Sequence, residues 1–159
     1  MSYDSDILLW SEQQADLLRR MARGERVNGL DWENVAEEIE SVGRSELHAV
    51  ESQLRVALTH LLLIALAPWP EPVRHWRAEA TAALAEAARG YAPSMAQRIR
   101  LDRVWRDALR VAERKLEGEA VTFGPNLAAM PFALAELVVE EPDLDALLTR
   151  LGSTSDRHD

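Results

Sequence analysis

The sequence predicts an all-α fold, a compact helical bundle of about four to six helices with one long kinked helix. Apolar residues recur at three- and four-residue steps over most of the chain, which is the spacing of one helix face. Prolines and glycines separate these stripes, and residue types that cap helices precede several of them. The apolar run at residues 121–123 is too short to argue for a sheet.

The first predicted helix begins after Ser5 or Asp6, either of which can act as its N-cap, and ends near Gly24. Gln14 occupies a position on the seam of this helix. Its apolar stripe consists of Ile7, Trp10, Leu17, Leu18 and Met21.

Asp31 can cap a second, much longer helix. Its apolar stripe first follows Trp32, Val35, Ile39 and Val42, and then slips by one residue before Leu47. The slip falls across Gly43, so we expect a kink or short break there.

Three prolines between Leu66 and Pro72 must interrupt regular helix, because proline lacks the backbone donor and clashes with the preceding turn. Further helices are expected from Val73 to Arg89, from Ile99 to Leu116, from Pro131 as the first helical residue, and over residues 144–151. We therefore expect a single helical domain over residues 1–151 and a disordered tail over residues 152–159.

Composition limits the class of protein. The 159 residues contain no cysteine and carry a formal net charge of −9. The acidic N-terminus does not resemble a signal peptide, and the longest apolar run is far shorter than the roughly 20 residues that span a bilayer. These features predict a cytoplasmic protein that has no disulfide and no membrane partner.

An acidic strip on the second helix is the main candidate for a functional surface. Its members advance by three or four residues and would share one face of a continuous helix. They are Glu33, Glu37, Glu40, Arg44 and His48, beside Trp32. Crowded carboxylates can hold a divalent cation or exchange protons, and Arg44 can bind an anion. A solvated or interface face is the simpler interpretation, because Glu40 and Arg44 form an ordinary i,i+4 pair.

A second charged feature is the basic stripe of Arg103, Arg106, Arg110 and Arg114. Residues 89–115 carry 8 basic and 3 acidic side chains, which would suit phosphates. The acidic protein as a whole repels nucleic acid, however, so we expect the stripe to complement an acidic face within the bundle or across a dimer.

The remaining chemistry-bearing residues form no known catalytic pattern. His60 lies among leucines, where a neutral, hydrogen-bonded histidine is expected more often than a metal ligand. Glu-x-x-His pairs, nucleotide-binding glycine loops, nucleophile elbows and zincin motifs are all missing. No cofactor and no metal site is therefore predicted.

The stretch from Leu30 to Glu46, together with Tyr3-Asp4, Trp10, Gln14-Ala15 and His60-Leu61-Leu62, resembles the domain-of-unknown-function family twenty-nine of cyanobacteria and proteobacteria. Arg74 and Trp76 are similar to a weaker segment of the same family. The resemblance implies an α-helical cytoplasmic protein with no established activity, and it supplies no catalytic residues.

From these observations we predict an interaction or regulatory module that binds a protein partner or a second copy of itself through the acidic face between Trp32 and Glu46. The alternative is a metal- or anion-binding enzyme that uses Glu37, Glu40 and Arg44, with His48 or His60 orienting the substrate. Gln14, Arg74 and Trp76 are secondary candidates.

Overall fold

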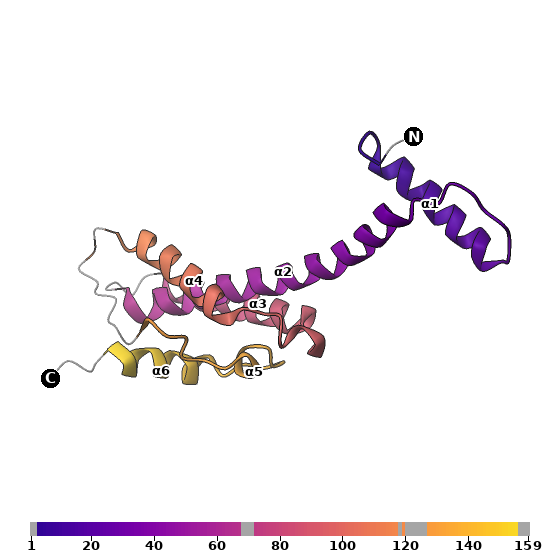
Figure 1. The fold of residues 1–159 in the computed structure, drawn as a ribbon. Coiled ribbons are helices and arrows are strands. Elements are labelled where there is room, and N and C mark those ends of the chain that lie inside the picture. Colours follow the sequence, from indigo (N-terminus) through magenta and orange to yellow (C-terminus); the bar gives the residue numbers. More distant parts are fainter. Residues whose placement is uncertain (1–2, 68–71, 118, 120–126, 156–159) are drawn as a thin grey trace. The chain divides into compact units, whose positions relative to one another are not determined.

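The computed structural model describes residues 3–67, 72–117, 119 and 127–155, and these residues form six α-helices and one 3₁₀ helix (Figure 1). No strand occurs among them, so the predicted all-α class is confirmed. The elements are α1 (Ile7–Ala22), α2 (Trp32–Leu66), α3 (Val73–Gly90), η1 (Pro93–Met95), α4 (Leu101–Lys115), α5 (Leu134–Leu137) and α6 (Leu144–Ser155).

The chain divides into two compact units, Met1–Ser45 and Glu46–Asp159, which we call unit 1 and unit 2. The division falls inside α2, and each unit is described by itself. The single domain expected over residues 1–151 stays a prediction. Helix α6 continues to Ser155, which makes the first part of the predicted tail helical, and residues 156–159 lie outside the described residues.

Unit 1 consists of α1, the following loop and the first part of α2. Helix α1 begins as expected, with the Asp6 carboxylate accepting the backbone N–H of Leu9 at 3.0 Å. It ends before Gly24, whose φ of 85° is a conformation that glycine adopts without strain. Trp10 and Val35 are the buried hydrophobic side chains among the described residues of this unit.

Of the kink or short break predicted at Gly43, the break is absent, because α2 remains helical from Trp32 to Leu66. A Cβ built on Gly43 would meet nothing within 4 Å, so neither a turn nor a close contact requires glycine there. The shift of the apolar stripe at this point marks instead the boundary between the two units, which falls after Ser45.

The core of unit 2 is built on the second part of α2, from Val50 to Leu63. Helix α3 packs there through small side chains. Its buried residues are Ala80, Ala83, Leu84 and Ala87, and Trp76 is half-buried. At the end of α3 the approach is so close that a Cβ on Gly90 would lie 3.1 Å from Val50 Cγ2. Helix α4 contributes Trp105, whose indole N–H donates to the Leu127 carbonyl at 2.8 Å.

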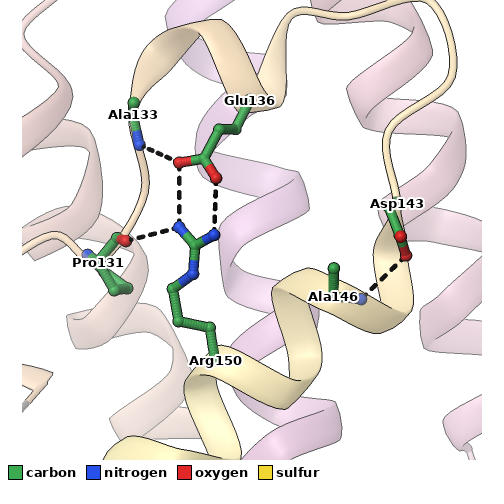
Figure 2. A network of polar contacts seen from close by, with 6 residues as sticks. All are labelled: Pro131, Ala133, Glu136, Asp143, Ala146 and Arg150. Atoms are coloured by element: carbon green, nitrogen blue, oxygen red, sulfur yellow. Dashed lines mark hydrogen bonds and ion pairs between the residues drawn. The ribbon is translucent and has the colours of Figure 1, made fainter.

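Arg150 joins the segment before α5 to helix α6 (Figure 2). Its guanidinium makes a bidentate pair with Glu136 at 2.7 and 3.0 Å and also donates to the Pro131 carbonyl. Glu136 in turn accepts the N–H of Ala133, the residue that precedes α5. The expectation that Pro131 starts this helix is wrong by three residues, because the first helical turn is organised around Glu136 rather than around the proline.

Helix α2 meets the length and composition criteria of a membrane-spanning helix, with a window of mean hydropathy 1.4 of which 44% is buried. It is the one helix of the described residues that does so. A core helix of a soluble protein passes the same test, and residues of α2 such as Leu54, Leu58 and Leu61 belong to the core of unit 2.

Candidate functional site

All members of the acidic strip except His48 lie on the first part of α2, within unit 1. Glu33, Glu37, Glu40 and Arg44 are all exposed. Arg44 Nη1 lies 3.4 Å from Glu40 Oε2, so the basic member of the strip is already paired with an acidic one. The arrangement gives a solvated, mainly negative surface whose arginine is partly neutralised by its neighbour.

Three large apolar side chains lie beside this strip without cover. Trp32, Ile39 and Val42 are 60%, 67% and 64% exposed, whereas Val35 of the same stripe is buried. Their spacing of seven and three residues places them on one side of the helix. Contiguous exposed apolar surface with a polar rim is typical of interaction sites.

A polar network around Asp31 fixes the start of α2 against α1. The Asp31 backbone N–H donates to Gln14 Oε1 at 2.8 Å, and Gln14 is only 8% exposed. The Asp31 carboxylate accepts from the Asn34 amide at 2.8 Å and from the Trp10 indole at 3.3 Å. Gln14, a secondary candidate from the sequence, therefore joins two helices of unit 1.

Hydrogen bonding controls the charge of this network. The bonds from Asn34, and then the bond from Trp10, lower the pKa of Asp31 against the opposing effect of partial burial. The carboxylate is thus held in the charged form that caps the helix. Tyr3 donates to Glu38 on the same helix, and this bond, together with burial and the charges of Glu38 and Glu37, raises the pKa of the phenol.

His60, Arg74 and Trp76, the other candidates, belong to unit 2. His60 is half-buried, and its Nδ1 lies 3.0 Å from the Val56 carbonyl. Burial, and to a lesser degree the charge of Lys115, lowers the pKa of His60. Arg74 is exposed at the start of α3, and Trp76 packs against the core from the same helix. These contacts give His60 and Trp76 packing roles.

Metal coordination receives no support in the described part of the chain, where no group of three or more His, Asp or Glu side chains could hold an ion. Glu37 and Glu40, the two carboxylates named for the metal-binding alternative, are both exposed on one helix.

His48 lies in a cleft between α2 and α4 that the sequence did not reveal. The cleft is lined from α2 by His48, Glu51, Ser52 and Arg55, and from α4 by Arg103, Val104 and Asp107. The sequence indicated Arg103 as a member of the basic stripe of α4, but no spacing in the sequence connected it with Arg55. Only the packing of α4 on α2 places the two arginines together.

The fold and these surfaces define an all-α protein whose candidate functional side chains lie on exposed helix faces and in an open cleft. The chain belongs to the family described as domain of unknown function DUF29, whose model matches residues 2–141.

A solved structure supports this assignment. The chain is similar to an alpha-helical protein of unknown function from Rhodospirillum rubrum, at 32% sequence identity and a TM-score of 0.72. The match covers 96% of this chain and 98% of that protein. No curated protein matches the chain. The resemblance noted in the sequence is thereby confirmed, and the comparisons assign no activity.

Proposed function

We propose that this protein is a helical interaction module that binds a protein partner through the exposed face of α2 in unit 1. The observation that carries the proposal is the exposure of Trp32, Ile39 and Val42 on one side of the helix. Full burial of a large aliphatic side chain is worth about 1.5–3 kcal/mol. The burial of each of these residues by a partner would therefore contribute a binding free energy several times the thermal energy.

The neighbouring charges indicate the chemistry of that partner. Glu33, Glu37 and Glu40 are exposed on the same helical segment as the apolar residues. An amphipathic helix with an apolar stripe and flanking lysines or arginines would complement both features. Another protein and a second copy of this chain are the two sources of such a helix, and the experiment below separates them.

The test compares three forms of the full chain in affinity capture from the native host and in light scattering over a range of concentrations. The test variant is Trp32→Ala/Ile39→Ala/Val42→Ala. The matched control, Leu8→Ala/Val139→Ala, removes exposed apolar surface elsewhere. We expect a captured protein, or a concentration-dependent dimer mass, in the wild type and the control, and its loss in the test variant.

A second variant, Glu33→Gln/Glu37→Gln/Glu40→Gln, tests the charge contribution. We expect weaker binding and a shallower dependence on salt, because screening acts on the acidic rim and leaves apolar burial intact. Identical partner lists and masses in all forms would refute the proposed surface.

The enzyme alternative receives less support from the described geometry. Glu37, Glu40 and Arg44 are exposed, and Arg44 is engaged by Glu40. A catalytic acid, base or metal ligand is usually found in a partly desolvated site, where its pKa can be adjusted. The arrangement of the three side chains suits a docking rim better than a reaction centre.

A further inference from the structure

The cleft between α2 and α4 lies wholly within unit 2 and is separate from the surface discussed above. Its volume is about 220 Å³. Clefts that hold drug-sized ligands measure about 300–1,000 Å³, so this one suits a smaller molecule. Of the residues that line it, Val104 is buried, whereas Arg55 and Arg103 are exposed.

The two acidic residues of the cleft already have partners. Glu51 accepts the backbone N–H of Arg100 at 3.1 Å and lies 3.5 Å from His48 Nδ1. Asp107 is paired with Arg110. By contrast, neither Arg55 nor Arg103 makes an ion pair within the described part of the chain. The cleft thus contains two arginine side chains that form no ion pair with its own carboxylates.

The geometry points to a binding site for a phosphate dianion, either inorganic phosphate or the phosphate group of a small monoester, between Arg55 and Arg103. Two guanidinium groups provide planar forks of N–H donors that match the oxygens of a phosphate. A phosphate dianion neutralises both arginines, whereas a single carboxylate would neutralise only one.

The remaining residues of the cleft favour a small ligand over a nucleic acid. Repulsion by Glu51 and Asp107, and by the net charge of −9 of the whole chain, grows with the number of phosphates, so it is larger for a polynucleotide than for one phosphate group. In a small monoester the same carboxylates and the Ser52 hydroxyl can accept hydrogen bonds from ligand hydroxyl groups. The site therefore favours a hydroxylated phosphate monoester over a bare polyanion.

Calorimetric titration of the full chain with inorganic phosphate, with glycerol 3-phosphate and with a single-stranded oligonucleotide tests this site. The variants are Arg55→Ala, Arg103→Ala and the conservative Arg103→Lys. Arg114→Ala, on the same helix but outside the cleft, is the matched control. Circular dichroism melts establish that each variant is folded.

We expect saturable one-to-one binding of phosphate or the monoester, weakened at least tenfold by each alanine substitution and less than twofold by Arg114→Ala. Arg103→Lys should keep part of the affinity, because it retains the charge and loses the fork. Tighter binding of glycerol 3-phosphate than of inorganic phosphate identifies a monoester as the ligand, and the reverse order identifies the free ion.

Three results would overturn the assignment. The first is absence of binding to the wild type at millimolar phosphate, and the second is an Arg114→Ala variant that weakens binding as much as the cleft variants do. The third is tighter binding of the oligonucleotide, with an affinity that depends on the total charge of the protein rather than on Arg55 and Arg103. None of them bears on the docking surface of unit 1, so the two proposals fail independently.

Discussion

Unit 1 and unit 2 both contain amphipathic helices, but large apolar side chains are mostly exposed in unit 1 and buried in unit 2. Of the large hydrophobic side chains exposed among the described residues, seven belong to unit 1 and only Val139 to unit 2. The described core of unit 2 contains 22 buried hydrophobic residues, against two in unit 1. The start of α2 in unit 1 is fixed by hydrogen bonds around Asp31. The comparison teaches that an apolar stripe in a sequence predicts a helix face, but not what covers it.

The largest expected effect comes from truncating a leucine in each unit. Leu58→Ala, in the core of unit 2, should lower the free energy of unfolding by about 2–5 kcal/mol, because it leaves a cavity. Leu8→Ala, at 67% exposure in unit 1, should change it by less than about 0.5 kcal/mol. Urea denaturation measures the free energy of unfolding of both variants, and equal losses of stability would contradict the difference between the two units.

A smaller effect is expected for the polar network of unit 1. Gln14→Ala removes the acceptor of the Asp31 N–H and should cost about 1–3 kcal/mol, while Gln13→Ala, an exposed neighbour, should be almost neutral. Hydrogen exchange at the start of α2 is the measurement, because it reports local opening. Unchanged protection in Gln14→Ala would show that the network does not hold this unit together.

Arg150 tests whether ion pairs also matter in unit 2. Arg150→Ala breaks contacts that join helix α6 to α5 and to the segment before α5, so it should lower the melting temperature more than Arg89→Ala, which breaks a pair within one helix. The hydrogen bond from Arg150 is the main cause of the lowered pKa of Glu136. Wild-type stability should therefore fall as the pH drops below the ordinary glutamate value of 4.5, and the variant should lose part of that slope.

The smallest effect is expected at His60. Burial lowers its pKa, so the unfolded chain binds a proton more readily than the folded protein does. Wild-type stability is complete above the ordinary histidine value of 6.5 and decreases as the pH falls from there towards the folded pKa. His60→Gln should reduce this slope, and thermal melts between pH 8 and pH 5.5 measure it. A constant difference between the two proteins across this range would contradict the prediction.

Much of the fold could be predicted because helix ends depend on local chemistry. The Asp6 carboxylate accepts the backbone N–H of Leu9, and the Asp143 carboxylate accepts that of Ala146. Asp31 accepts that of Asn34 at 3.4 Å. The break expected at Gly43 and the helix start expected at Pro131 are absent, because glycine tolerates helix and proline does not require it. The Pro131 carbonyl accepts a hydrogen bond from Arg150, a contact that no spacing in the sequence indicates.

The candidate surfaces were only partly predictable. The spacing of Glu33, Glu37 and Glu40 placed them on one helix, and the structure finds them exposed. The spacing of Trp32, Ile39 and Val42 predicted an apolar stripe on one helix face, but hydrophobicity alone does not tell that these three side chains are exposed while Val35 is buried. The cleft was missed because Arg55 and Arg103 are far apart in the sequence and meet only after two helices pack.

The buried face of α3 has a consequence for the entropy of folding. Ala80, Ala83 and Ala87 have no side-chain rotamers to lose, whereas each buried leucine or isoleucine gives up about 0.5–1 kcal/mol of rotamer freedom. Among the buried residues of helix α3, only Leu84 therefore loses side-chain rotamer freedom on folding. The same close packing leaves no space for larger side chains. At Gly90 even one added methyl group would force Val50 to move by a few tenths of an ångström.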